Sequence, residues 1–189
     1  CLLPISSKKL IELQAKLAVG KEPKIVTLPN DFKVSEALER FINRLGYSII
    51  FVDPEKSLNS ALLEVLDFCK KEDKIKIIFG DTLVELPKIS KQQSDFLLFK
   101  ENFQPYDWCF VTDTKNGLHF SGDKDVSETN RVVCGYFEFS NLNLLKKAFS
   151  RKQFSDALNF YSSQQKLSLI KAKNWMDFGH LSFLFKSKK

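Results

Sequence analysis

The sequence predicts one α/β domain, with helices on both faces of a mixed, mostly parallel central sheet. Three observations lead to this fold class. Short apolar runs alternate with helical patterns through the first part of the chain. The runs at 48–52 and 75–79 are almost continuously apolar, which is typical of strands covered on both faces. The length of 189 residues suits one domain of three α/β/α layers better than two domains.

The N-terminal elements follow the order expected of βαβ units. Helices are predicted at 7–18, 34–45 and 58–70, and strands at 24–28, 48–52 and 75–79. Gly46 is placed as the C-terminal cap of the second helix and Ser57 as the N-cap of the third. Because βαβ units build parallel sheets, the three strands are predicted to be mutually parallel in one sheet.

The pattern changes after Asp81. Strands separated by turn-rich stretches follow, and some of them should be antiparallel. The predicted strands are 95–100, 106–112, 117–121, 131–139 and 167–172, and the predicted helices are 142–150 and 153–163. The end of the chain, 175–185, reads as a loop running into a short helix.

Composition excludes several classes of function. The net charge of +6 comes mainly from scattered lysines without a dense basic stripe, so a basic surface around an anionic small molecule is favoured over nucleic-acid binding. No apolar run approaches the length of a membrane span, and no segment has the order of a signal peptide, which together predict a cytoplasmic protein without membrane insertion. The four cysteines form no CxxC pair and are predicted as free thiols rather than zinc ligands.

Gly80-Asp81 is the first candidate site. It follows a predicted strand, and ligands of open α/β sheets bind at the carboxyl ends of strands. A carboxylate there, after a glycine that allows close approach, suits Mg²⁺ together with substrate phosphates. The alternative is a turn aspartate that caps the next segment.

The second candidate is the cluster Trp175-Met176-Asp177-Phe178-Gly179-His180. Its alternative reading is a packed tryptophan followed by a helix-capping aspartate. In this order along the chain, the two motifs resemble those of the nucleotide-sugar pyrophosphorylases, a Rossmann-like family of the GT-A fold. That resemblance implies that Asp81 and Asp177 bind one catalytic Mg²⁺, and that Trp175 braces the loop carrying Asp177.

The resemblance extends over nearly the whole chain. Residues 2–12 look like the family segment after its Pro-Lys, and 57–62 look like the helix start that contacts the nucleotide base, which implies a role for Ser60. The hairpin 117–124 implies that Lys124 holds the acceptor phosphate. The strand 134–139 implies that Gly135 lies beside the sugar. The version Asp-Phe-Gly-His is similar to nucleotidyltransferases of bacterial capsule loci, and His180 is assigned either to phosphate contact or to helix capping.

This sequence departs from the family pattern at three places. It does not contain the Gly-rich loop that cradles nucleotide phosphates through backbone amides. Because Cys1 aligns just past that loop, residues 1–189 are interpreted as one nucleotidyltransferase-like domain that lacks its first strand and phosphate loop, and that does not turn over substrate alone. Asn59 stands where the family has glycine, and Asp125 stands where proline would follow Lys124.

The implied reaction transfers a nucleoside monophosphate from a nucleoside triphosphate to a sugar phosphate, for capsule or surface polysaccharide synthesis. Two other classes stay open: a degenerate, non-catalytic scaffold in polysaccharide assembly, and a GT-A glycosyltransferase. The glycosyltransferase reading is disfavoured because Asp81-Thr82-Leu83 lacks the second aspartate of an Asp-x-Asp motif. Assembly into a homo-oligomer also stays open.

Overall fold

The fold was analysed in a computed structural model, which describes residues 1–5, 7–18, 23–70, 74–88, 95–101, 108–115, 117–122 and 130–179. Its helices are α1 (Leu10–Gln14), α2 (Glu36–Arg44), α3 (Leu58–Leu66), α4 (Leu142–Phe149) and α5 (Phe154–Gln164). Its first strands are β1 (Pro4–Ile5), β2 (Lys8–Lys9), β3 (Lys24–Pro29), β4 (Tyr47–Val52), β5 (Ile75–Ile78) and β6 (Thr82–Glu85). The later strands are β7 (Phe96–Glu101), β8 (Phe110–Thr114), β9 (Gly117–Ser121), β10 (Arg131–Phe139), β11 (Ser168–Lys171) and β12 (Asn174–Asp177).

A mixed sheet of six strands forms the centre of the molecule. Its order is β11-β7-β10-β8-β9, and β5 pairs with β10 beyond the stretch that β8 occupies. The pairing of β11 with β7 is parallel, and the other pairings in this sheet are antiparallel. The predicted mixed α/β class is confirmed, although parallel pairing among the described strands is less common than the sequence indicated.

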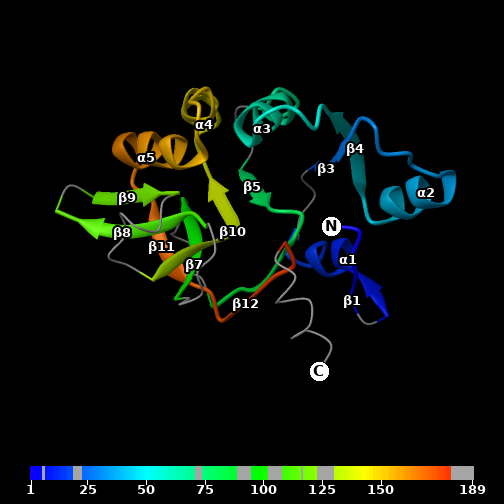
Figure 1. The fold of residues 1–189 in the computed structure, drawn as a ribbon, viewed down its shortest axis with the longest axis horizontal. Coiled ribbons are helices and arrows are strands. Elements are labelled where there is room, and N and C mark those ends of the chain that lie inside the picture. Colours follow the sequence, from blue (N-terminus) through cyan, green and yellow to red (C-terminus); the bar gives the residue numbers. More distant parts are fainter. Residues whose placement is uncertain are drawn as a thin grey trace.

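Two helical layers cover the sheets. Helices α3, α4 and α5 lie along one side in Figure 1, where Leu66, Leu145 and Leu158 share a buried cluster with Ile75 and Ile77 of β5. On the other side, α1 and α2 share a cluster with β3, made of Ile11, Ile42, Val26 and Leu28. The first cluster packs helices on the six-stranded sheet, and the second packs helices on the sheet of β3 and β4.

One detail of the sheet prediction is wrong. Strands β3 and β4 pair in parallel, as expected, but they form a separate sheet. Strand β5 pairs antiparallel with β10 and joins neither of them. The βαβ spacing shows only that a helix separates two strands, and a helical connection can leave a strand position open between them.

Local capping follows the sequence closely. Ser57 Oγ accepts a hydrogen bond from the backbone of Ser60 at 3.2 Å and so caps α3, as predicted. Gly46 has φ of 82°, a left-handed conformation that a glycine after α2 adopts easily. The four cysteines are free thiols, with Cys134 buried. Burial raises the pKa of the Cys109 thiol to about 12.

The end of the described chain differs from the prediction. Residues 174–177 form β12, which pairs antiparallel with β6, rather than a loop.

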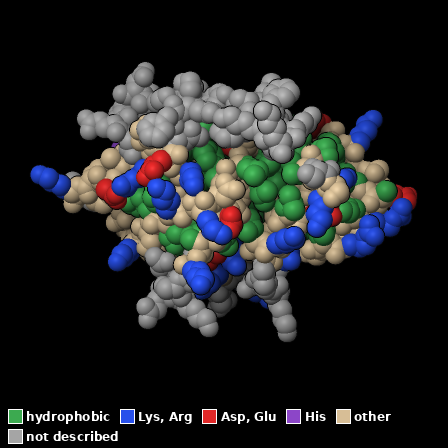
Figure 2. Space-filling model, turned by 90° about the horizontal axis from the view of Figure 1, so that it is seen from below, with side chains coloured by type: hydrophobic (Ala, Val, Ile, Leu, Met, Phe, Trp, Pro, Cys, Tyr) green, Lys and Arg blue, Asp and Glu red, His purple; other side chains and the backbone are tan. Residues whose placement is uncertain are grey.

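No helix in the described ranges is long and apolar enough to cross a membrane. Figure 2 shows lysine and arginine side chains scattered over one face of the molecule rather than gathered in a stripe.

Candidate active site

The Gly80-Asp81 pair lies in a tight turn between β5 and β6. The backbone N–H of Thr82 donates to the carbonyl of Phe79 at 3.1 Å, which closes the turn. The N–H of Phe79 donates to the carbonyl of Gly135 at 2.9 Å, which ties the turn to the middle of β10. Asp81 is exposed at the tip, so its carboxylate is presented by a well-anchored piece of backbone.

Gln14, at the end of α1, holds the same turn from the other side. Its side-chain amide donates to the carbonyl of Phe79 at 2.8 Å and to that of Thr82 at 2.6 Å. Gln14 is only 5% exposed, so both bonds lie in a water-poor environment where breaking them is costly. Sequence reasoning missed this residue, because a glutamine in a short helix carries no motif.

Gly135 packs beneath the turn. Its φ is 73°, and a Cβ added there would lie 3.0 Å from Phe79 Cδ2 and from Thr82 Oγ1. Only a glycine combines that conformation with such close packing. The family resemblance implies that Gly135 lies beside the sugar, which stays a prediction; in the structure it packs against the turn that carries Asp81.

Strand pairing brings Asp177 next to the turn that carries Asp81. In the register of β12 with β6, Asp177 lies opposite Thr82. The N–H of Phe178 then donates to the carbonyl of Asp81 at 2.7 Å, which extends the contact past the end of the ladder. Two motifs far apart in sequence therefore meet backbone to backbone.

The two carboxylates converge on Gly179. A Cβ added to Gly179 would lie 2.6 Å from Asp81 Oδ2 and 3.2 Å from Asp177 Oδ1. These two oxygens are therefore within about 6 Å of each other, the sum of the two lengths. A methyl group at this position would crowd both oxygens, so the glycine leaves room for the two carboxylates.

Asp177 is the buried member of the pair, at 5% exposed. Its Oδ2 accepts a hydrogen bond from the indole N–H of Trp108 at 2.8 Å, and its Oδ1 accepts one from the backbone of Gly179 at 2.7 Å. Hydrogen bonds to an ionised carboxylate compensate part of the cost of burying its charge. Trp108 was not predicted, since it lies outside both motifs.

Trp175 supports this arrangement through Trp108. The two indoles meet edge to face with their centroids 5.2 Å apart. Trp175 also packs against the buried cluster that contains Val84, Leu98 and Tyr136. Trp175 therefore contacts the residue that orients Asp177, which is compatible with the bracing role inferred from sequence.

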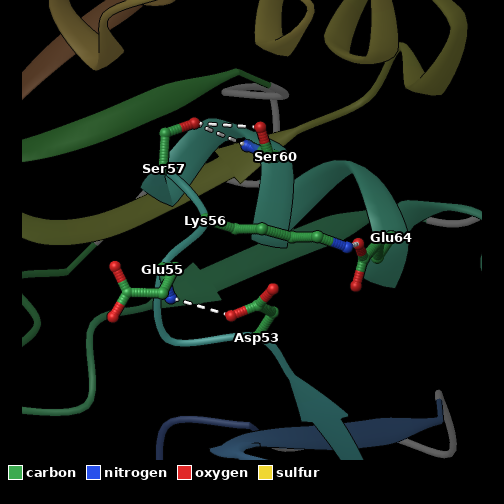
Figure 3. A network of polar contacts seen from close by, with 6 residues as sticks. All are labelled: Asp53, Glu55, Lys56, Ser57, Ser60 and Glu64. Atoms are coloured by element: carbon green, nitrogen blue, oxygen red, sulfur yellow. Dashed lines mark hydrogen bonds and ion pairs between the residues drawn. The ribbon is translucent and has the colours of Figure 1, made fainter.

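Ser60 lies in the first turn of α3, in a network of polar contacts shown in Figure 3. Its hydroxyl is 3.0 Å from that of Ser57, while Lys56, which precedes α3, pairs with Glu64 of the helix. The neighbouring Asn59 is buried and donates to the carbonyls of Arg151 and Gln153. The side chains at the start of α3 therefore already make hydrogen bonds within the protein. A base-binding role for this stretch would have to be compatible with those bonds.

Two predicted residues, Lys124 and His180, lie outside the described residues. Within the described ranges, no three histidine, cysteine, aspartate or glutamate side chains cluster as a complete metal site. A pair of carboxylates still fits Mg²⁺, which takes one or two carboxylates and completes its octahedron with water and substrate phosphates. Asp81 and Asp177 supply such a pair beside Gly179.

Comparison with known proteins places the fold. No protein-family model matches the chain, and no curated protein matches it significantly. Among solved structures, a Bacillus anthracis protein described as a glucose-1-phosphate thymidylyltransferase, in complex with sucrose, superposes with a TM-score of 0.75 at 14% identity, covering 98% of this chain and 83% of that one.

Two further structures agree. A UDP-glucose pyrophosphorylase complexed with UDP-glucose gives a TM-score of 0.73 at 14% identity, covering 98% of this chain and 87% of that one. A nucleoside-diphosphate-sugar pyrophosphorylase from Vibrio cholerae RC9 gives 0.71 at 14% identity, covering 98% and 89%. Identity this low shows the fold alone. The chain therefore has the mixed α/β fold of the nucleotide-sugar pyrophosphorylases, in agreement with the resemblance of its motifs.

Proposed function

We propose that this chain is a domain of a sugar-phosphate nucleotidyltransferase, which transfers a nucleoside monophosphate from a nucleoside triphosphate to a sugar phosphate. The observation that carries the proposal is the convergence of Asp81 and Asp177 on Gly179. The similar structures support it, since their descriptions name a thymidylyltransferase and pyrophosphorylases, one of them holding UDP-glucose.

In the proposed reaction, an oxygen of the sugar phosphate attacks the α-phosphate in line, and pyrophosphate leaves. The protein has little covalent chemistry to perform, so catalysis is positioning and neutralisation of charge. Mg²⁺ bound by Asp81 and Asp177 would supply Lewis-acid stabilisation to the phosphate oxygens. The carboxylate of Asp177 is held by hydrogen bonds from Trp108 and Gly179, so it would be the ligand with a fixed position. The carboxylate of Asp81 is exposed, so it would be the ligand that changes its rotamer to meet the cation.

The remaining assignments belong to the proposal as well. Lys124 would hold the acceptor phosphate as a point charge, and His180 would contact phosphate or cap the following segment. Gly80 would let the substrate approach the backbone, and Ser60 would contact the base. Capsule or surface polysaccharide synthesis and a cytoplasmic location remain predictions of the sequence.

The metal site can be tested separately from turnover. Binding of Mn²⁺, a paramagnetic substitute for Mg²⁺, is measured by water-proton relaxation for the chain and for its Asp81→Asn and Asp177→Asn variants. Each variant should weaken binding by at least about tenfold, because one anionic ligand of a hard cation is lost. Asp67→Asn is the control: Asp67, the C-cap residue of α3, is exposed and pairs with Lys146 at 2.7 Å. Unchanged binding in both site variants would contradict the shared site.

Activity is then assayed on the longest natural form of the protein, as pyrophosphate release with a panel of nucleoside triphosphates and sugar phosphates. Loss of either aspartate should lower the rate by about a hundredfold or more while the melting temperature stays near that of the wild type. Metal binding without any pyrophosphate release would favour the non-catalytic scaffold. Glycosyl transfer from a nucleotide sugar would favour the glycosyltransferase.

A further inference from the structure

The two oxygens of the Asp177 carboxylate are held by different parts of the chain. Oδ2 accepts the indole N–H of Trp108, which precedes β8, at 2.8 Å, and Oδ1 accepts the backbone N–H of Gly179 at 2.7 Å. Of the two oxygens, Oδ1 is the nearer to the Cβ position of Gly179, at 3.2 Å, and Asp81 Oδ2 lies 2.6 Å from the same point. Oδ1 is therefore the oxygen on the side of Asp81, and Oδ2 is the oxygen on the side of the indole.

Trp108 is itself firmly placed. It is 9% exposed and shares a buried cluster with Phe110 and Val132, and its ring meets that of Trp175 edge to face at a centroid distance of 5.2 Å. A large side chain in a close-packed cluster changes its rotamer only at a cost in packing. The direction of the indole N–H is therefore fixed, and a carboxylate that turned away from it would lose a charge-assisted hydrogen bond.

This arrangement bears on which cation the carboxylate can bind. Mg²⁺ is held by single oxygens in a small octahedron, whereas Ca²⁺ accepts a larger and more variable set of oxygens that often includes both oxygens of one carboxylate. To bind a cation through both oxygens, Asp177 would have to turn Oδ2 toward the cation and away from the indole. The hydrogen bond from Trp108 opposes that rotation.

We propose that Trp108 determines the specificity of the cation site, favouring Mg²⁺ over Ca²⁺ because it holds Asp177 in the orientation that offers Oδ1 alone. Trp108 acts through Asp177, so it is a positioning residue and not a ligand. It would act on the cation site of the proposed function, on which this inference rests. The property that it sets is the choice of cation, and this can be measured without any turnover.

The test measures how Mg²⁺ and Ca²⁺ each displace bound Mn²⁺, by water-proton relaxation, in the wild type and two variants. Trp108→Phe removes the donor and keeps an aromatic ring. Phe110→Leu is the matched control, since Phe110 is 2% exposed in the same cluster and has no polar side-chain atom. Trp108→Phe should raise the affinity for Ca²⁺ relative to Mg²⁺ by about tenfold, the effect of one hydrogen bond to a charged group. Phe110→Leu should leave this ratio unchanged, because lost packing affects both cations alike.

A second measurement uses the wild-type chain, so it does not depend on the folding of a variant. The chain has two tryptophans, which give two indole N–H signals in NMR spectra that nuclear Overhauser contacts can assign. Saturating Mg²⁺ should shift the Trp108 signal, because the charge on its acceptor is partly neutralised. The same N–H should stay protected from exchange with solvent, because its bond to Oδ2 is kept when Oδ1 binds the cation.

The possible failures give different results. If the wild type binds no Mn²⁺, or if Asp81→Asn and Asp177→Asn leave binding unchanged, the cation site is wrong and the role of Trp108 falls with it. If Mn²⁺ binds through both aspartates but Trp108→Phe weakens Mg²⁺ and Ca²⁺ equally, the site stands and Trp108 contributes packing alone. Loss of exchange protection at the Trp108 indole in the Mg²⁺-bound wild type would likewise overturn the proposal and leave the site intact.

Discussion

Gly179 is the residue on which the geometry of the carboxylate pair depends most directly. It donates its backbone N–H to Asp177, and its missing side chain leaves room for Asp81. The sequence motif contained this glycine, but its role could not be read from the motif. A glycine after an aspartate more commonly indicates a turn, whereas here it separates two charges of the same sign.

Replacing Gly179 by alanine should therefore damage cation binding more than folding. The added methyl would lie 2.6 Å from Asp81 Oδ2, which is closer than real contacts allow, so the Asp81 side chain must rotate away. We expect Mn²⁺ affinity to fall by about tenfold, with a change in unfolding free energy below about 1 kcal/mol, because the displaced Asp81 side chain is exposed. Relaxation titration and thermal unfolding measure the two effects.

Gly122→Ala is the matched control for this substitution, since a Cβ at Gly122 would meet nothing within 4 Å. That variant should bind Mn²⁺ as the wild type does. A Gly179→Ala protein with unchanged affinity would show that the space between the carboxylates is not where the cation binds.

At the scale of elements, the turn between β5 and β6 is held by three different parts of the chain. β10 anchors it through Gly135, the residue after β12 anchors it through the backbone of Phe178, and α1 anchors it through Gln14. Helix α1 has only five residues, too few to be stable alone, so its position depends on these tertiary contacts. In return, its last residue immobilises the turn that presents Asp81.

Gln14→Leu should test this coupling. The substitution keeps the approximate volume but leaves the carbonyls of Phe79 and Thr82 without their side-chain donor. We expect a loss of about 1–3 kcal/mol in unfolding free energy, measured by urea denaturation. Gln164→Leu is the control, since Gln164 is exposed at the end of α5 and its change should stay within about 0.5 kcal/mol. Equal losses of unfolding free energy in the two variants would contradict the view that Gln14 holds the turn.

At the scale of the molecule, Asp95 ties β7, β10 and α5 together. It is 3% exposed and accepts hydrogen bonds from the backbone and hydroxyl of Ser140, from Tyr161 and from Gln165, each at 2.7 Å. Burial alone would raise the pKa of Asp95. The hydrogen bonds from Ser140, Tyr161 and Gln165 outweigh that effect and lower the pKa below its ordinary value.

This network predicts a pH dependence of stability. A carboxyl whose pKa is lower in the folded state contributes stability above its unfolded pKa of about 3.9 and loses it as the pH falls through the folded value. Asp95→Asn should therefore cost about 2–4 kcal/mol at pH 7 and progressively less at acid pH, as measured by urea denaturation across the pH range. The exposed Asp67→Asn control should cost less than about 1 kcal/mol at pH 7. A penalty for Asp95→Asn that stays constant down to acid pH would contradict an ionised Asp95 in the fold.

The sequence was sufficient to predict the α/β class and most of the helices and strands, because these follow from local periodicity and capping. Ser57 and Gly46 are examples in which one side chain, or its absence, sets an element boundary. The sequence also singled out Asp81 and Asp177, since each stands in a motif of adjacent residues. These features are encoded within a few positions of one another along the chain.

Tertiary structure was needed for everything that depends on register between distant segments. Pairing of β12 with β6 places Asp177 opposite Thr82, and a shift of one residue would turn its side chain to the other face. Trp108 and Gln14 reach the site only through packing, so no local pattern marks them. The separation of β3 from β5 also depends on tertiary structure. The spacing of helices and strands along the sequence gives the order of the strands in the chain, but it does not determine which strand edges pair.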